Sequence, residues 1–223
     1  MSAILPRPAA VLFDLDGTLL DSAPDLAAAL AHYTAAQGVA MPDYARVRAV
    51  VSAGGSAILR TAWPDAPPAR IAELLPGYLA IYAQMLAERS RLFPGLEALL
   101  ARIEALPLPW GIVTNKITAL TVPLLQRLHL QARLGALVCG DTLARKKPDP
   151  APLLHACTLL RVAPERCVYV GDDRRDIEAA RAAGMPGIAV GWGYSNGENP
   201  ADWQADALAE DAAGLARLLA LPA

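Results

Sequence analysis

The pattern of apolar and polar positions predicts that buried strands and amphipathic helices alternate along most of the chain. Apolar runs favour strands over residues 11–16, 110–115, 134–141, 167–172 and 187–192. Helical patterns lie between them, over residues 95–106, 118–128, 150–160 and 173–183. Strands that alternate with helices through short loops indicate an α/β fold, in which a mostly parallel sheet is covered by helices on both faces.

Residues 23–90 break this alternation, because their pattern is helical and contains no convincing strand. Helices are expected over residues 24–37, over 44–63 with a break at Ala53-Gly54-Gly55, and over 69–89. We interpret this segment as a helical domain inserted after the first strand. The predicted boundaries are residues 1–22 and 91–223 for the α/β core and residues 23–90 for the insertion.

Composition and charge narrow the class of protein. The 223 residues are 54% hydrophobic, which is enough for a substantial core, and the net charge is −2. Because no basic stripe is present, we expect no binding to nucleic acid or to an anionic membrane surface. The longest stretch without a charged residue, 26–42, is too polar to cross a membrane, and the N-terminus has no secretory pattern. We therefore expect a cytoplasmic protein.

Three cysteines, at positions 139, 157 and 167, are too few and too scattered for a disulfide framework. None of them forms a Cys-x-x-Cys pair. The cysteines therefore point to neither a secreted scaffold nor a zinc site.

Polar residues follow four of the predicted strands. The segments are Asp-Leu-Asp-Gly-Thr at 14–18, Thr-Asn-Lys at 114–116, Gly-Asp at 140–141 and Val-Gly-Asp-Asp at 170–173. In open α/β sheets, ligands bind outside the carboxyl ends of the strands. The polar residues at these four ends are therefore candidates for a single site.

Asp14 and Asp16 are two residues apart, so an extended backbone would point both carboxylates the same way. Two like charges this close need a cation, and Mg²⁺ is suitable because it binds carboxylates, water and phosphate oxygens. Gly17 permits an abrupt turn and Thr18 offers a hydroxyl to anchor it. The alternative is a strand that ends in a capping aspartate and a turn.

A second acidic cluster lies at residues 170–178. Asp172 follows Gly171 directly at a strand end, so it is the better metal ligand of the group. Asp176 falls one helical turn later on the same side. Asp173 and Asp176 can equally be residues that cap the following helix.

Lysine occurs at only three positions, Lys116, Lys146 and Lys147, although arginine is frequent. Lys116 completes Thr114-Asn115-Lys116, whose hydroxyl, amide and ammonium groups could donate to a phosphate. Lys147 precedes Pro148, which favours an extended backbone at that position. We expect Lys116 and Lys147 to be functional and Lys146 to be a solvated surface residue.

Taken together, four segments resemble the motifs of the haloacid dehalogenase-like hydrolase superfamily. They are D-L-D-G-T-L-L-D-S, V-T-N, K-P-D-P and G-D-D-R-R-D, in the family's order. The resemblance covers the whole chain. It implies a Rossmann-like, doubly wound parallel sheet core with an inserted all-helical cap domain that closes over the site.

The resemblance also implies roles for individual residues. Asp14 would be the nucleophile that forms an aspartyl-phosphate, and Asp16 would be the general acid and base. The Asp14 side chain, the Asp16 backbone carbonyl and Asp172 would bind Mg²⁺. The residues that contact the phosphoryl group and the substrate would be Thr114, Asn115, Lys147, Lys116, Gly17 and Thr18. Asp176 would orient Lys147 or a metal-bound water, with Asp173 in support.

The segment Val-Val-Ser-Ala-Gly-Gly-Ser, residues 50–56, lies where such caps present a loop that contacts substrate. Gly54, Gly55 and Ser56 are therefore candidate substrate contacts, together with Ser52 and Arg60. The alternative is a glycine-rich break in a helix.

The family resemblance leaves the substrate open between two small phosphorylated metabolites. The layout and Thr-Asn-Lys resemble phosphoglycolate phosphatases, whereas the cap loop and residues 193–206 look closer to N-acetylmuramic acid 6-phosphate phosphatases. A monomer or a homodimer is expected.

Three other functions are compatible with part of this pattern. Dehalogenases of the superfamily lack the second aspartate, so Asp16 and Asp172 argue against that activity. A sugar-phosphate mutase of the β-phosphoglucomutase type shares the nucleophile and the acid. A phospho-accepting receiver domain has similar residues on a doubly wound sheet, but it has no helical insertion.

Overall fold

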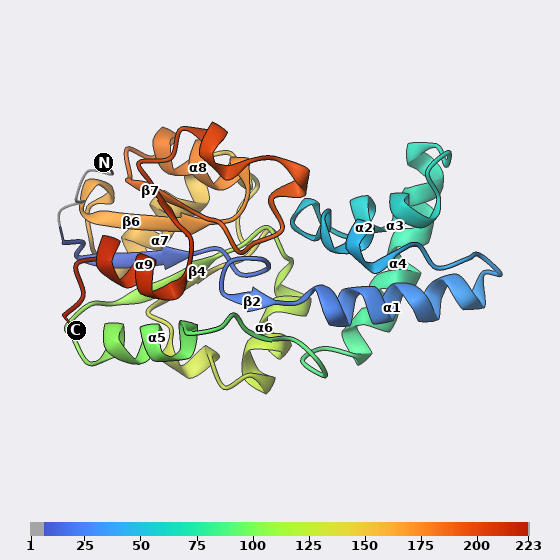
Figure 1. The fold of residues 1–223 in the computed structure, drawn as a ribbon, viewed down its shortest axis with the longest axis horizontal. Helices are drawn as coiled ribbons and strands as arrows, with labels where there is room; N and C mark the ends of the chain where they lie inside the picture. The colour runs from blue at the N-terminus through green and yellow to red at the C-terminus, as the bar shows by residue number, and fades with distance from the viewer. Residues whose placement is uncertain (1–6, 223) are drawn as a thin grey trace.

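A computed structural model describes residues 7–222. Its central element is a six-stranded sheet of order β5-β4-β1-β6-β7-β8, in which all neighbours are parallel (Figure 1). The strands are β1 (Ala10–Phe13), β4 (Trp110–Val113), β5 (Ala136–Val138), β6 (Cys167–Gly171), β7 (Gly187–Val190) and β8 (Ala207–Ala209). The predicted α/β fold with a parallel sheet is therefore confirmed.

Alternate residues of β1 face opposite sides of the sheet, and each side has its own apolar core. Val11 and Phe13 belong to a cluster with leucines of α5 (Leu96–Glu104), α6 (Thr118–Arg127) and α9 (Ala212–Leu218). Ala10 and Leu12 belong to a second cluster, which includes residues of α7 (Ala151–Leu160) and α8 (Arg174–Ala182). Helices thus cover both faces, as expected for a doubly wound sheet.

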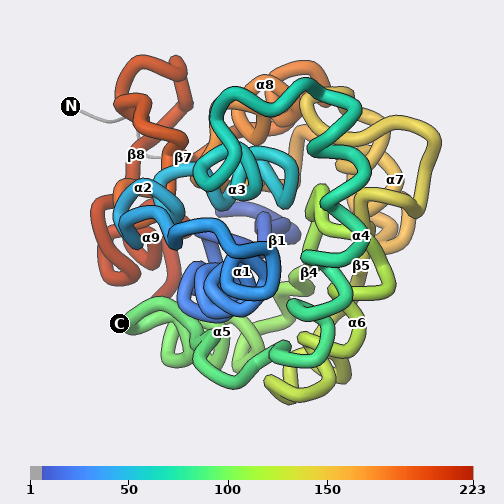
Figure 2. The backbone as a smooth tube through the Cα atoms, turned by 90° about the vertical axis from the view of Figure 1, so that its right-hand side faces the viewer, coloured from blue at the N-terminus to red at the C-terminus, as the bar shows by residue number. Residues whose placement is uncertain are grey.

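The helical segment of residues 23–90, which lies between β1 and β4, contains four α-helices and one 3-10 turn. They are α1 (Ala23–Ala36), α2 (Tyr44–Arg48), η1 (Val51–Ala53), α3 (Gly55–Ala62) and α4 (Pro68–Gln84). In Figure 1 these helices lie to one side of the sheet, and in Figure 2 they face the viewer in front of it. We call residues 23–90 the helical insertion.

Several predicted boundaries in the helical insertion are wrong. The helix expected from residue 44 ends at Arg48, so the break begins before Ala53-Gly54-Gly55. Gly54 has φ +88°, a backbone conformation that ends the 3-10 turn and precedes α3. The helix expected over 69–89 ends at Gln84.

Two short strands join the helical insertion to the core, and neither was predicted. β2 (Leu20–Asp21) and β3 (Arg91–Leu92) form an antiparallel pair at the two ends of the insertion. Beside them, the buried carboxylate of Asp25 accepts hydrogen bonds from the backbone N–H groups of Arg89 and Ser90 at 2.7 and 3.0 Å. The two connections are therefore fixed to each other.

The remaining elements are short. Four 3-10 turns complete the description: η2 (Gln131–Arg133), η3 (Pro164–Arg166), η4 (Ser195–Gly197) and η5 (Pro200–Trp203). Strand β8 and helix α9 were not predicted. Within residues 7–222, no helix has the length and apolar character needed to cross a membrane.

Candidate active site

A cavity of about 290 Å³ lies between the carboxyl ends of β1 and β4 and the helical insertion. The core contributes mostly polar residues to its wall, and the insertion contributes mostly apolar ones. The core residues are Asp14, Asp16, Thr114, Asn115, Lys116, Ile117, Leu120, Lys146 and Arg175. The insertion residues are Leu26, Val51, Ser52, Ala53, Gly54, Gly55, Ser56, Ile58, Leu75, Leu79 and Tyr82.

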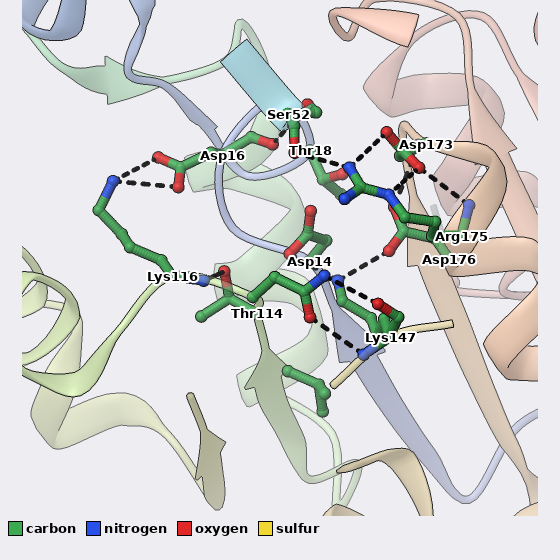
Figure 3. A network of polar contacts seen from close by, with 12 residues as sticks. Asp14, Asp16, Thr18, Ser52, Thr114, Lys116, Lys147, Asp173, Arg175 and Asp176 are labelled. Atoms are coloured by element: carbon green, nitrogen blue, oxygen red, sulfur yellow. Dashed lines mark hydrogen bonds and ion pairs between the residues drawn. The ribbon is translucent and has the colours of Figure 1, made fainter. Parts of the chain in front are cut away.

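Lys147 lies at the centre of the polar network beside this cavity (Figure 3). Its Nζ lies 2.8 Å from Asp14 Oδ1, 2.7 Å from Asp176 Oδ1 and 2.7 Å from Tyr169 Oη. The contacts with Asp176 and Tyr169 are hydrogen bonds, and the contact with Asp14 is an ion pair. Burial opposes the charged form of Lys147, but the charges of Asp14 and Asp176 outweigh it and raise its pKa. The site therefore holds a charged lysine beside Asp14.

Asn115 fixes the backbone of Lys147. Its Nδ2 donates to the Lys147 carbonyl at 3.0 Å, and its Oδ1 accepts from the Lys147 N–H at 3.1 Å. Both ends of the amide are therefore occupied, and the side chain positions Lys147. The second hydrogen of Nδ2 is not used in this pair and Asn115 lines the cavity, so the expected role of the amide as a phosphate donor stays a prediction. Thr114 is buried at the end of β4 and lines the cavity.

The carboxylates of Asp14 and Asp16 are not directed to one common cation, contrary to the expectation from their spacing. β1 ends at Phe13, so the strand alternation does not extend to Asp16. The Asp16 carboxylate instead accepts from Lys116 Nζ at 3.1 Å to each oxygen, and from the Ser22 hydroxyl. Each carboxylate thus has its own lysine.

Lys116 is enclosed between Asp16 and the helical insertion. Its Nζ lies 4.7 Å from the centre of the Tyr82 ring on α4. Burial opposes the charged form of Lys116, but Asp16 and Tyr82 raise its pKa. Lys116 was expected to contact phosphate; in the structure its charge is directed to Asp16.

Three buried carboxylates form a candidate metal centre. One oxygen each from Asp14, Asp172 and Asp176 lies within 4.8 Å of the others. Burial and the charges of Asp14 and Asp176 raise the pKa of Asp172 to about 8. A hard divalent cation such as Mg²⁺ fits this all-oxygen set and would offset its charge. The carboxylate of Asp16 is not part of the set, whereas Asp176, expected to be a supporting residue, is.

Gly17 and Thr18 lie against Asp172 and are not among the residues that line the cavity. Gly17 has φ +88°, and a Cβ at this position would lie 2.1 Å from Asp172 Oδ2. Thr18 Oγ1 donates to Asp172 Oδ1 at 2.9 Å. The turn after β1 therefore packs directly on Asp172, and only glycine fits at its tightest point.

Asp173 and Asp176 are both capping residues and parts of the polar network. Asp173 is the N-cap of α8, and its side chain accepts from the Arg175 N–H at 2.9 Å. Asp176 Oδ2 accepts from the Asp173 N–H at 3.0 Å and so completes a capping box. Its other oxygen is paired with Lys147. The two predicted roles of these residues, as helix caps and as parts of the site, are thus compatible.

The helical insertion reaches the metal centre through Ser52. Its Oγ donates to Asp172 Oδ2 at 2.8 Å. Its carbonyl accepts from Arg175 Nη2 at 2.7 Å (Figure 3). Gly54, Gly55 and Ser56 line the cavity, as expected. Arg60 does not: it is exposed and donates to the Ala66 carbonyl at 3.4 Å.

Sequence reasoning missed three residues of this region. Tyr169 contacts Lys147, Tyr82 contacts Lys116, and Arg175 joins the core to Ser52. Arg175 lies inside the fourth motif, so its position was a usable signal. Nothing in the spacing of Tyr169 or Tyr82 indicates their contacts, which arise from folding.

The family model described as haloacid dehalogenase-like hydrolase matches residues 11–190, which is most of the chain and contains all four motifs. The chain belongs to this family. The prediction from the motifs is confirmed, and the receiver-domain reading is wrong.

Several relatives of this chain are named as phosphatases. A phosphoglycolate phosphatase of Xanthomonas campestris is 48% identical over 204 residues, which cover 91% of this chain and 92% of that protein. An N-acetylmuramic acid 6-phosphate phosphatase of Pseudomonas aeruginosa is 45% identical over 208 residues, covering 92% and 91%. A crystal structure of a predicted phosphoglycolate phosphatase from Haemophilus somnus has a TM-score of 0.86 at 25% identity, covering 96% and 99%. These names agree with the predicted enzyme class, a phosphatase-like hydrolase.

Proposed function

We propose that this hydrolase is a Mg²⁺-dependent phosphomonoesterase that forms an aspartyl-phosphate at Asp14 and acts on a small phosphorylated metabolite. The observation that carries the proposal is the convergence of the Asp14, Asp172 and Asp176 carboxylates, two of them paired with Lys147, beside a cavity that the helical insertion also lines. The phosphatase names of the relatives support it.

In the first step, a carboxylate oxygen of Asp14 attacks phosphorus and the bond from phosphorus to the leaving oxygen breaks. Asp16, on the same cavity wall, enters this step protonated and gives its proton to the leaving oxygen, which departs as an alcohol. Lys147, which is paired with Asp14, and Thr114, on the cavity wall, would bind phosphoryl oxygens and stabilise the charge on them.

In the second step, Asp16 accepts a proton from a water molecule that attacks the phosphorus of the aspartyl-phosphate. The bond between phosphorus and the Asp14 oxygen breaks, inorganic phosphate leaves, and the Asp14 carboxylate is restored. The helical insertion excludes bulk water during the transfer.

The carboxylates of Asp14, Asp172 and Asp176 would hold the Mg²⁺ ion, and the Asp16 carbonyl remains a predicted further ligand. When bound, the ion would offset the negative charge on the phosphoryl oxygens. Gly17, Thr18 and Ser52 keep Asp172 in position for this role.

Two substrates are candidates, 2-phosphoglycolate and N-acetylmuramic acid 6-phosphate, because relatives at similar identity carry both names. A phosphomutase remains the alternative reaction, but no contact in the cavity specifically favours it. A cytoplasmic location and a monomeric or dimeric state remain predictions from the sequence.

The test is phosphate release with Mg²⁺ from both esters and from phenyl phosphate. Wild type should hydrolyse at least one ester. Asp14→Asn should abolish turnover but remain folded, which a measurable melting temperature would show. A parallel purification of each protein controls for contaminating phosphatases. Equal release by wild type and Asp14→Asn would reject Asp14 as the nucleophile, and no release from any ester would reject the phosphatase.

A further inference from the structure

Arg175 occupies the contact between the core and the helical insertion, at the wall of the cavity (Figure 3). Its Nε and Nη2 donate to the two oxygens of Asp173 at 2.7 and 2.8 Å. Nη2 also donates to the Ser52 carbonyl at 2.7 Å. The guanidinium plane is therefore fixed on one side by the core and on the other by the insertion.

The same contacts leave one edge of the guanidinium free. Of its five N–H donors, three are used by Asp173 and Ser52. The two on Nη1 have no hydrogen-bond partner among residues 7–222, and the side chain is 33% exposed. Nη1 therefore offers a fixed, charged donor to a carboxylate oxygen, and because its two N–H groups diverge, one of them would make the contact.

The other cations of the cavity are less suited to this task. Lys116 is directed to Asp16, and Lys147 lies between Asp14 and Asp176 at the phosphoryl end. Lys146 lines the cavity but is exposed and forms no ion pair within residues 7–222. Among the cations that line the cavity, Arg175 is thus held by two residues and keeps two donors, both on Nη1, without a hydrogen-bond partner within residues 7–222.

Arg175 lies next to Ser52 of the insertion, so it faces the part of the cavity where the leaving group would sit. The phosphoryl group would lie deeper, against Asp14 and Lys147. Both esters named in the relatives carry a carboxylate in addition to the phosphate. A carboxylate on the leaving group is therefore a feature that the two candidate substrates share and that lies within the chemistry of Arg175.

We propose that Arg175 binds a carboxylate on the leaving group, so that the substrates of this enzyme are phosphate monoesters of carboxylic acids. The proposal rests on the proposed phosphatase function and specifies its substrate class. The carboxylate could come from a glycolate ester or from the lactyl group of a muramic acid ester, and the experiment separates these two sources.

The experiment compares each acid with its uncharged carboxamide. The pairs are 2-phosphoglycolate with 2-phosphoglycolamide, and N-acetylmuramic acid 6-phosphate with the amide of its lactyl group. We expect wild type to prefer the acid of one pair by about 10- to 100-fold in kcat/KM, the range of a charge-assisted hydrogen bond. The pair that shows the preference identifies the source.

Arg175→Gln should remove that preference by lowering kcat/KM for the acid and leaving the amide nearly unchanged. Arg175→Lys, which keeps the charge but not the planar fork, should restore part of it. Arg174→Gln is the matched control: the neighbouring Arg174 is exposed and pairs with Glu198 at 2.8 Å. It should keep the wild-type preference.

Three results would overturn the proposal. An equal loss for acid and amide in Arg175→Gln would mean that Arg175 only fastens Ser52. Weaker product inhibition by inorganic phosphate in that variant would place Arg175 at the phosphoryl group. Loss of the preference in Lys146→Gln, with Arg175→Gln unaffected, would assign it to Lys146. A wild type that hydrolyses none of the esters would instead reject the phosphatase function itself.

Discussion

Asn115 and Lys147 exchange two hydrogen bonds although they are 32 residues apart in the chain. The amide of Asn115 thereby pairs with both backbone groups of Lys147, and the loop that follows β4 holds the loop that precedes α7. The lysine ammonium then reaches Asp14, Asp176 and Tyr169. The position of this charge is thus set by its backbone as well as by its ion pairs.

Replacing Asn115 should therefore lower turnover without removing any group that reacts. We expect Asn115→Ala to reduce kcat by about 10- to 100-fold, because a displacement of about 1 Å in a charged group is enough for such a loss. Asn115→Asp keeps the acceptor and loses the donor, so it should be intermediate. Steady-state kinetics would measure both, with exposed Asn199→Ala as a control; wild-type kcat in Asn115→Ala would contradict the role.

Two tyrosines on α4 offer a matched test of stability. Tyr78 Oη donates to the Leu26 carbonyl at 3.1 Å, whereas Tyr82 Oη is buried without a hydrogen-bond partner among residues 7–222. Tyr78→Phe should lower the free energy of unfolding by about 1 kcal/mol, because a buried hydrogen bond is lost. Tyr82→Phe should leave it unchanged or raise it slightly. Urea unfolding of both variants decides, and a larger loss in Tyr82→Phe would show that its hydroxyl has a partner.

The sequence was sufficient to predict those parts of the site that follow from local rules. Asp14, Thr114 and Asp172 each end an apolar run, and parallel strands bring their carboxyl ends together. The four ordered motifs added Lys147, which no local pattern places beside Asp14. The placement of these residues was therefore predictable from strand ends and motifs together.

The remaining features depend on contacts between distant segments. β2 and β3 have two residues each and pair across the whole helical insertion, so neither has a detectable strand pattern. β8 is three residues of alanine and leucine at the edge of the sheet. The separation of Asp14 from Asp16 arises because β1 stops at Phe13, and strand ends are poorly marked in a sequence.

The stability of the metal-free protein should depend on the ionisation of Asp172. Its pKa is raised to about 8, whereas an unfolded aspartate titrates near ~4. Between these values the folded state binds a proton that the unfolded state does not, so this contribution to stability falls as pH rises from about 4 to 8. In EDTA, wild type should therefore lose stability relative to Asp172→Asn between pH 5 and pH 8.

Added Mg²⁺ should reverse this trend, because it binds the ionised carboxylates. The increase in melting temperature on adding Mg²⁺ should be larger at pH 8 than at pH 5 in wild type, and small at both in Asp172→Asn. Thermal melts with and without Mg²⁺ would measure it. A Mg²⁺ effect that is the same at both pH values, or that survives in the variant, would argue against Asp172 as a ligand.

Gly17 links the turn after β1 to the same carboxylate, and a comparison with Gly38 isolates that contact. Both glycines have positive φ, +88° and +66°, but only Gly17 would bring a Cβ against Asp172, whereas Gly38 has open space. Each alanine variant should lose about 1–2 kcal/mol of stability from backbone strain. Gly17→Ala should lose more, together with most of its activity and its thermal response to Mg²⁺, because Asp172 must move. Gly38→Ala should keep both. A Gly17→Ala protein with a wild-type Mg²⁺ response would show that Asp172 tolerates the displacement and that the close packing is not needed for metal binding.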